Sequence, residues 1–279
     1  VFKSIKKKYR AIIIDPKGDL VQKLKKIKPH VVFNALHGRF GEDGYIQSIL
    51  EKERIKYTHS GVRSSSIAID KDLSKKIFNK HKILTPYSIK MKYSKLNKKK
   101  IQTDIKKKFK YPVVVKPINE GSSVGVYICN KQNIFKSLDK LKNYNEVLIE
   151  QYIPGKEIQV AIMGKRKLGA IELVPKRKFY DYKAKYNKNA NTKHIMPANI
   201  SKDNYEKAMN IALKAHKLLK CRGVTRSDFK FFNNKFYLLE LNTQPGMTAL
   251  SLVPEIARYK NISFFKLLLW IINDASINK

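Results

Sequence analysis

Two carboxylates and an amide occur close together near the C-terminal end of the chain, on a segment with the pattern of a β-hairpin. Asp228 lies in one apolar run, VTRSDFKF, and Glu240 and Asn242 lie in the next, KFYLLELN. The intervening Asn233-Asn234 is a typical hairpin turn, which would bring opposed residues of the two strands together. Because Mg²⁺ prefers oxygen ligands and often shares them with a substrate phosphate, the three side chains are candidate metal ligands. A solvated sheet face is the alternative interpretation.

The same alternation assigns a face to the neighbours of these residues. Arg226 lies two positions before Asp228 and therefore shares its face, where a cation and a metal would address one anionic group. Leu239 and Leu241 are predicted to point the other way. The hairpin is thus expected to have one chemical face and one apolar face.

Two further segments have residue types suited to a nucleotide. In VVVKPINEGSSVGV (113–126), Lys116 precedes a Gly/Ser-rich loop whose backbone N–H groups can surround phosphate. The loop matches neither the Walker A nor the G-x-G-x-x-G pattern, so an ordinary turn stays an alternative. In LIEQYIPGKE (148–157), Glu150 and Glu157 are candidate acceptors for a nucleotide amine or ribose, with charged strand ends as the alternative.

His37 follows an apolar run, in the loop HGRFGEDG (37–44), and is a candidate on the substrate side. A lone histidine in this position is also compatible with a purely structural role. The order of residues shows no Ser-His-Asp arrangement with a nucleophile elbow, which excludes the usual hydrolase chemistry.

The elements that must position these residues follow from the apolar runs. Strands are expected over 11–15, 31–36, 111–117 and 147–153, with helices between them. Asp70 is a predicted helix cap, with Leu73 and Ile77 on one face of that helix. Helices over 203–219 and 263–273 complete a mixed α/β fold with α+β elements.

The chain of 279 residues has a formal net charge of +37, yet only nine of its 59 basic residues are arginine. Arginine is preferred for planar base and phosphate recognition, so a solvated lysine surface explains the charge better than specific nucleic-acid binding. The cysteines, Cys129 and Cys221, have no metal-binding spacing, which predicts a reducing compartment, the cytoplasm. The apolar run ISFFKLLLWII is too short to span a membrane.

Taken together and in order, the segments resemble the D-alanine–D-alanine ligases of the ATP-grasp superfamily. The matching pieces are ALHGRFGEDGYIQSILE, SGVRSSSIAIDK, YPVVVKPINEGSSVGV, LIEQYIPGKEIQVAIMG, FYDYKAKY, TRSDF and YLLELNTQPGMTALSLVP. The resemblance implies an ATP-grasp fold in three units. These are a truncated, Rossmann-like N-terminal substrate domain (1–58), a central subdomain (59–154) and a C-terminal subdomain with the metal and substrate site (155–279).

The resemblance also implies a role for individual residues. ATP would be bound by Lys71, Lys116, Glu120, Ser122, Ser123, Glu150, Ile153, Glu157 and Lys185. Catalytic roles fall to Arg226, Ser122, Tyr186 and Gly246, and substrate roles to His37, Ser251 and Leu252. Asp228, Glu240 and Asn242 would bind two Mg²⁺ or Mn²⁺ ions.

The implied reaction joins two D-alanines through an acyl phosphate, at the expense of ATP, for peptidoglycan synthesis in a cytoplasmic homodimer. Tyr186 favours the D-alanine amine as acceptor, because family members that use D-lactate have phenylalanine there. A degenerate nucleotide-binding protein, a ligase for another carboxylate–amine pair and a polyanion-binding protein are the alternatives.

The chain departs from the family at its front. The family opens with a strand, a Gly-rich loop and a glutamate that holds the first D-alanine, whereas the first glycine here is Gly18 and the first glutamate Glu42. Either the sequence is incomplete or the element is lost, and a lost central strand would leave its neighbours unpaired. His59 replaces a usual glycine, so a strained turn is expected there.

Overall fold

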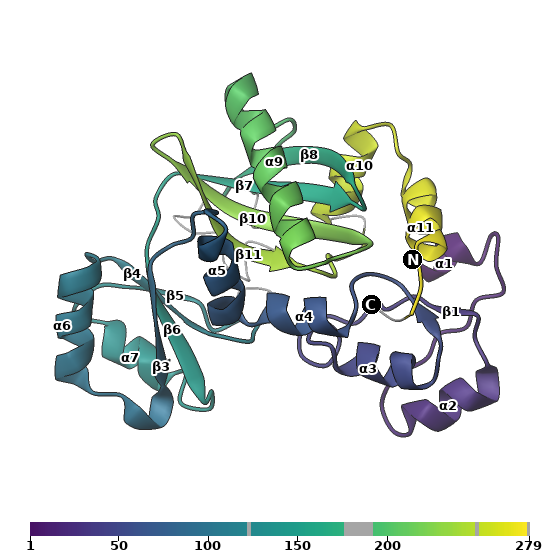
Figure 1. Ribbon diagram of the computed structural model, residues 1–279, viewed down its shortest axis with the longest axis horizontal. Coiled ribbons are helices and arrows are strands. Elements are labelled where there is room, and N and C mark those ends of the chain that lie inside the picture. The colour runs from purple at the N-terminus through teal and green to yellow at the C-terminus, as the bar shows by residue number, and fades with distance from the viewer. Residues whose placement is uncertain (122–123, 176–191, 249–250, 278–279) are drawn as a thin grey trace.

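The computed structural model describes residues 1–121, 124–175, 192–248 and 251–277. Two antiparallel sheets dominate these residues, with strand orders β3-β6-β4-β5 and β11-β10-β7-β8-β9. The first consists of β3 (Ser88–Lys92), β4 (Val113–Pro117), β5 (Tyr127–Cys129) and β6 (Glu146–Gln151). The second consists of β7 (Lys156–Met163), β8 (Arg166–Val174), β9 (Lys193–Ile195), β10 (Val224–Phe232) and β11 (Lys235–Asn242). The predicted mixture of helices and sheets is confirmed, and Figure 1 shows the two sheets side by side.

Helices cover both faces of the five-stranded sheet because its strands alternate apolar side chains between the two faces. On β7, Ile158 and Val160 pack with α9 (Lys202–Leu218) in one core. Ala161 and Met163 pack on the other side with α10 (Leu252–Tyr259) and α11 (Phe264–Asn273). The sheet that carries the predicted metal ligands is therefore held rigidly from both sides.

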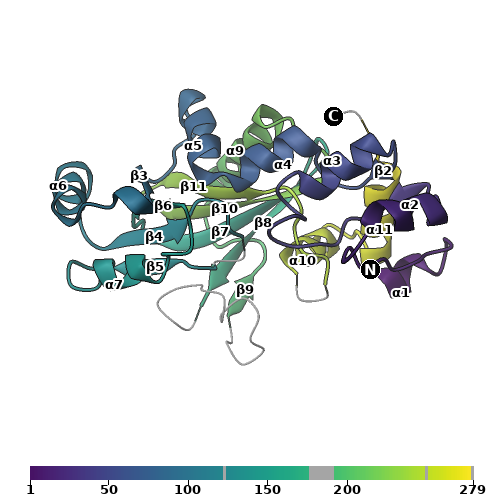
Figure 2. The same cartoon turned by 90° about the horizontal axis from the view of Figure 1, so that it is seen from below.

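The four-stranded sheet has a separate core. Ile101 and Ile105, one turn apart on α6 (Lys98–Lys108), pack with Val113 and Val115 of β4. A short helix, α7 (Ile134–Asp139), adds Ile134 and Leu138 to this cluster, and the 3₁₀ turn η1 (Tyr93–Lys95) precedes α6. Figure 2 shows this unit at the opposite end of the molecule from α1, α2 and α3.

The helix pair α4 (Val62–Ile69) and α5 (Lys71–Lys80) lies between these regions. Asp70 caps α5 as predicted, its carboxylate accepting from the N–H groups of Asp72 and Leu73. Ile77 packs against the main core, but the side chain of Leu73 is exposed. Lys71 and Lys75 lie one turn apart on α5, and both are buried on the face of this helix that is directed between the two sheets.

The N-terminal region is less regular than predicted. It contains α1 (Phe2–Ile5), α2 (Leu20–Ile27), α3 (Tyr45–Lys52) and a parallel pair of two-residue strands, β1 (Val31–Val32) and β2 (Lys56–Tyr57). The strand predicted over 11–15 is wrong: these residues form no strand, and Ile12 and Ile13 are 52% and 71% exposed. The strand predicted over 31–36 is limited to β1. A strand depends on a hydrogen-bonded partner, and segment 11–15 has none within the described residues.

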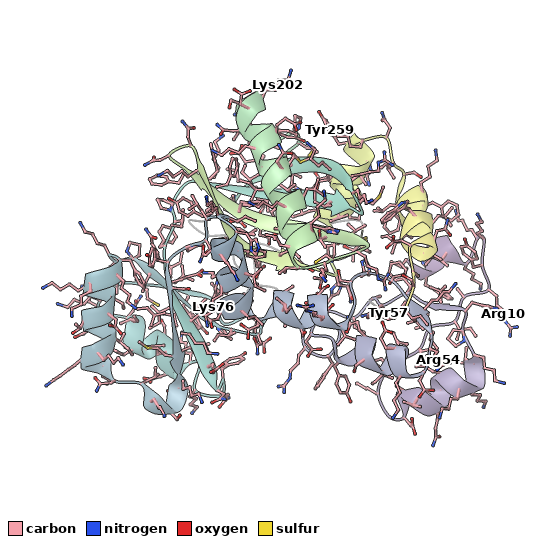
Figure 3. All side chains as sticks on the ribbon, viewed as in Figure 1. Arg10, Arg54, Tyr57, Lys76, Lys202 and Tyr259 are labelled. Atoms are coloured by element: carbon pink, nitrogen blue, oxygen red, sulfur yellow. The ribbon has the colours of Figure 1, made fainter. Side chains whose placement is uncertain are left out.

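Charged side chains radiate from every part of the molecule. Figure 3 shows charged side chains on all sides, with Arg10 and Arg54 labelled in the N-terminal region, Lys76 on α5 and Lys202 at the start of α9. This distribution agrees with a solvated lysine surface spread over the chain. Within the described ranges, we find no helix with the length and apolar character needed to cross a membrane.

Candidate active site

A pocket of about 760 Å³, partly open to solvent, lies between the two sheets. Eight residues selected from the sequence line it: Lys71, Lys116, Glu120, Glu150, Ile153, Glu157, Asp228 and Glu240. Residues distant in the sequence therefore converge on one site. Val114, Val126 and Leu239 add apolar surface to the same pocket, which suits a ligand with a flat apolar part and a charged part.

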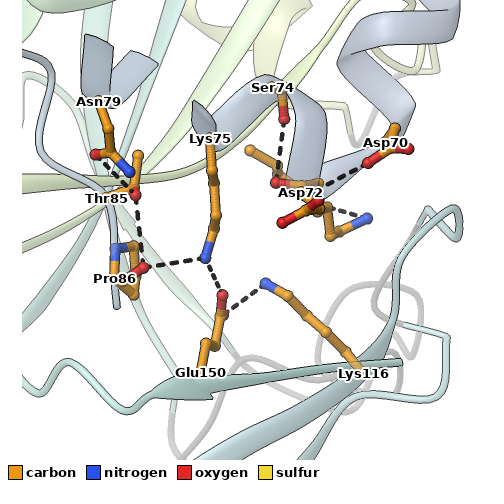
Figure 4. Close-up of polar contacts among 11 residues, drawn as sticks. Asp70, Asp72, Ser74, Lys75, Asn79, Thr85, Pro86, Lys116 and Glu150 are labelled. Carbon is orange, nitrogen blue, oxygen red and sulfur yellow. Dashed lines mark hydrogen bonds and ion pairs between the residues drawn. The ribbon is translucent and has the colours of Figure 1, made fainter. Parts of the chain in front are cut away.

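A buried cluster of two lysines around one glutamate lies at the pocket wall, which Lys116 and Glu150 line. Lys116 Nζ donates to Glu150 Oε1 over 2.6 Å, and Lys75 Nζ donates to Glu150 Oε2 and, over 3.4 Å, to the carbonyl of Pro86. Figure 4 shows the two lysines reaching the carboxylate from α5 and β4. Glu150 thus fixes both ammonium groups.

Burial and charge oppose each other in this cluster. Burial alone raises the pKa of Glu150, but the ammonium groups of Lys116 and Lys75 outweigh it and hold that pKa below its ordinary value. Burial lowers the pKa of Lys75 to about 8, although Glu150 partly offsets the effect. The cluster has more positive than negative groups, so it favours an incoming anion.

Lys71 connects the cluster to the metal-binding candidates. Its ammonium donates to the backbone carbonyl of Glu120 and lies 3.6 Å from Glu240 Oε2. Burial lowers the pKa of Lys71, and Glu240 partly restores it. One lysine therefore touches both the loop predicted to cover phosphates and a predicted metal ligand.

The hairpin has the predicted turn. Asn233 and Asn234 have φ values of 47° and 57°, as a tight hairpin turn with two left-handed residues requires. Asp228 pairs with Glu240, and Arg226 pairs with Asn242. The three oxygen-bearing side chains therefore lie at one end of the hairpin, close to the pocket.

The prediction that Leu239 and Leu241 share the apolar face is wrong. The register shifts between Asp228 and Phe229, and this irregularity puts Leu238 and Leu241 in the core under α9. Leu239 instead lines the pocket beside Glu240. A β-bulge adds one residue to one strand and so interrupts the alternation.

Arg226 makes a two-pronged contact with Asp228. Its Nε and Nη2 atoms lie 2.7 and 2.9 Å from Oδ1 and Oδ2 of the carboxylate. Such a paired geometry is the strongest form of an arginine–carboxylate contact. The guanidinium supplies positive charge at the position where the sequence predicted a metal.

The donor set fits a divalent cation that prefers oxygen. Two carboxylates and one amide supply only oxygen ligands, and Asn242 is oriented because its Oδ1 accepts the N–H of Gln244 over 2.8 Å. The described part of the chain contains no cluster of three or more His, Cys, Asp or Glu side chains with metal-binding geometry. Asn242 is therefore needed to complete the set.

A second group of predicted residues meets beside this end of the hairpin. A Cβ atom added at Gly246 would lie 3.0 Å from Ser251 Oγ and 3.8 Å from His37 Cε1. His37 Nδ1 is 3.3 Å from Glu42 Oε1, and the Gln244 amide donates to the carbonyl of Leu36. The HGRFGEDG loop of the N-terminal region therefore lies beside Gly246 and Ser251.

Leu252 is placed differently from its neighbours. Its side chain packs into the core beneath α10, where it is nearly inaccessible, so only its backbone is available to a ligand. Ser251 precedes it as the N-cap residue of α10. Four predicted residues, Ser122, Ser123, Lys185 and Tyr186, lie outside the described residues.

Lys75, Lys230 and Leu239 belong to the site although the sequence reasoning did not select them. Lys75 had a usable signal, since it lies four residues after Lys71 and therefore on the same helix face. That signal is weak in a chain with a lysine in nearly every segment. Alternation along β10 places Lys230 on the face of Asp228, but its partner Glu157 depends on the strand pairing, and the position of Leu239 depends on the bulge.

Two antiparallel sheets that enclose a lysine- and acid-lined pocket define the ATP-grasp class. A family model described as "D-ala D-ala ligase C-terminus" matches residues 83–273. A D-alanine–D-alanine ligase of Pelagibacter ubique is 64% identical over 99% of this chain and 90% of its own length. The chain belongs to the D-alanine–D-alanine ligase family.

Solved structures give the same result. A D-alanine–D-alanine ligase from Bacillus anthracis superposes with a TM-score of 0.84 and 35% identity, over 96% of this chain and 87% of that one. A structure of that ligase complexed with ATP gives a TM-score of 0.82 and 30% identity over the same shares of the two chains.

Proposed function

We propose that this chain joins two D-alanine molecules into D-alanyl-D-alanine for peptidoglycan synthesis, with conversion of ATP into ADP and phosphate. The observation that carries the proposal is the identity of 64% with a D-alanine–D-alanine ligase over almost the whole chain. The pocket supports it, because its charged residues are those expected for binding and transferring a phosphoryl group.

The reaction needs activation because a carboxylate is a poor acyl donor. The carboxylate of the first D-alanine attacks the γ-phosphate of ATP, giving an acyl phosphate and ADP. The amine of the second D-alanine then attacks the acyl carbon, and phosphate leaves. The site must hold both substrates in line and keep water away, since an acyl phosphate hydrolyses readily.

We assign the phosphates to Lys116 and Lys71, whose ammonium groups neutralise charge during transfer. Glu150 holds Lys116 in place, and the backbone of Ile153 is left to read the adenine edge. Glu157 accepts the ribose hydroxyls. The position of these residues on the pocket wall supports these assignments.

Asp228, Glu240 and Asn242 would hold two Mg²⁺ ions, for which Mn²⁺ can substitute. Such ions, when bound, would neutralise negative charge on the phosphate oxygens. Arg226 and the backbone at Gly246 are assigned to the negative charge that develops on the reacting carbonyl and phosphate. His37, Ser251 and the backbone of Leu252 are assigned to the D-alanine side.

We further propose a cytoplasmic homodimer and a division into units 1–58, 59–154 and 155–279. Both cysteines are free thiols, and burial raises the pKa of Cys221 to about 12, as suits a protein kept reduced. Light scattering of the purified chain tests the dimer, and limited proteolysis tests the boundaries.

The decisive assay measures release of ADP and phosphate with and without D-alanine, together with chromatography of the dipeptide. We expect both products to depend on D-alanine. ATP binding without D-alanine-dependent turnover would instead indicate a degenerate nucleotide-binding protein. Turnover only with a different acceptor in a panel of amino acids would indicate another carboxylate–amine pair.

A further inference from the structure

Lys230 and Glu157 form an ion pair on the pocket wall that the proposed reaction does not require. They are direct partners across β10 and β7, and Lys230 Nζ lies 3.2 Å from Glu157 Oε2. The two side chains are only 13% and 9% exposed, and both line the pocket. Lys116 has a comparable arrangement on the four-stranded sheet, where its ammonium contacts Glu150, whereas Lys230 contacts Glu157, the residue assigned to the ribose.

The position of Lys230 separates it from the phosphate-binding lysines. It lies two residues after Asp228 on β10, which places its Cα about 7 Å further along the strand. Tyr152, Ile153 and Leu239 line the pocket together with it. Its cross-strand partner is Glu157, the residue assigned to the ribose, so that assignment puts Lys230 on the nucleoside side of the pocket.

The Lys230 ammonium compensates the charge of the buried Glu157 carboxylate. A carboxylate removed from water needs a cation or several hydrogen bonds, and Lys230 supplies a cation to Glu157. The methylene groups of Lys230 cover apolar surface while the ammonium holds the carboxylate, as long basic side chains commonly do. A carboxylate held in this way is ready to accept hydrogen bonds from two adjacent hydroxyl groups.

We propose that Lys230 is a positioning residue for ribose recognition: it holds the Glu157 carboxylate toward the 2′ and 3′ hydroxyls of the nucleotide and so makes the site selective for ribonucleotides. This inference rests on the proposed function, since it assumes that ATP occupies the pocket. It predicts that Lys230 affects which sugar is bound, whereas Lys71 and Lys116 affect how strongly phosphates are bound.

Calorimetric titration with ATP and with 2′-deoxy-ATP, without D-alanine, tests the proposal. We expect the unmodified chain to bind ATP at least about tenfold more tightly than 2′-deoxy-ATP, the usual effect of a hydrogen bond to a charged group. Lys230→Met keeps the stem and removes the ammonium, and it should reduce this ratio to within about twofold. Lys230→Arg should retain most of it.

Two further variants separate positioning from a general structural effect. Glu157→Gln should lose the ratio as Lys230→Met does, and the double variant should lose no more than either alone. Lys156→Met is the matched control, because Lys156 is the neighbouring residue and pairs with Glu172 over 3.1 Å rather than with Glu157. It should leave the ratio unchanged, and thermal unfolding confirms that each variant is folded.

An unchanged ratio in a folded Lys230→Met variant, with both nucleotides weakened equally, would overturn the inference. So would an unmodified chain that does not distinguish the two sugars, a result that needs no variant at all. In both cases ATP still binds and the proposed function stands. A chain that binds no nucleotide would overturn the proposed function itself.

Discussion

The two sheets around the pocket hold their charged residues in different ways. On the four-stranded side, Lys116 and Glu150 are buried together with Lys75, and every charge has a partner inside the cluster. On the five-stranded side, Asp228 contacts Arg226 and Glu240 lies 3.6 Å from Lys71, so a bound metal ion or phosphate would compete with these ion pairs. We therefore expect the first sheet to be a preformed support and the second to exchange partners when substrates bind.

The largest effect is expected where the second sheet changes partners. Asp228→Asn keeps the size of the side chain but removes a charge from the proposed metal site, so D-alanine-dependent ADP release should fall by about a thousandfold. Asp72→Asn, which alters an exposed pair with Lys76, is the control and should retain activity. A folded Asp228→Asn variant with nearly full activity would remove Asp228 from the metal site.

The second prediction concerns the four-stranded sheet and the stability that its buried charge cluster depends on. Glu150→Gln leaves Lys75 and Lys116 buried without a counter-charge, which should lower the free energy of unfolding by about 3–5 kcal/mol in urea titrations. The control is Glu146→Gln on the same strand, because Glu146 forms a more exposed pair with Lys90. That change should cost less than about 1 kcal/mol. Equal losses in the two variants would contradict the difference between the sheets.

The connection between the sheets gives a third test. Gly155 lies between β6 and β7 with φ 97°, and an added Cβ would lie 2.3 Å from the carbonyl oxygen of Phe231. Gly155→Ala should therefore destabilise the protein by about 2–3 kcal/mol through strain and displacement of β10. Gly18→Ala, also at positive φ but with only the flexible Lys23 side chain nearby, at 4.0 Å, should cost only about 1 kcal/mol. Similar values for both in thermal unfolding would argue against close packing at this connection.

The smallest effect concerns acid stability at the join between the N-terminal region and the five-stranded sheet. Burial, followed by the charge of Arg222, lowers the pKa of His59 to about 3. Below pH 6.5, His59 is protonated in the unfolded chain but stays neutral in the native chain. Stability therefore falls as the pH decreases below 6.5. The contribution is at most about 1.4 kcal/mol per pH unit.

His59→Gly should flatten this dependence in urea titrations between pH 7 and pH 5. Burial lowers the pKa of His216 to about 4, so this second histidine provides the same slope in both proteins and serves as the internal reference. An unaltered slope would show that His59 is not the buried neutral group. The φ of 68° at His59 also confirms the strained turn expected where the family usually has glycine.

Local patterns were sufficient wherever one segment determines its own structure. The two-residue turn at Asn233-Asn234 followed from the local sequence, and the cap of α5 followed from Asp70. Three results required tertiary information. The run 11–15 has strand-forming residues but no partner strand, the bulge beside Asp228 reverses the face of Leu239, and the partners of Lys75 and Lys230 lie on other elements.

The turn at Asn233-Asn234 has a consequence for changes in chain length. Surface turns usually tolerate insertions well, because few contacts depend on them. Here the turn and the register shift beside Asp228 together set which residues of β11 pair with β10, although the turn is several residues away from Asp228 and Glu240. One extra residue would move Glu240 and Asn242 to the face covered by α9, since a shift of one residue exchanges the two faces of a strand. The length of this distant turn is therefore as restricted as the side chains in the pocket.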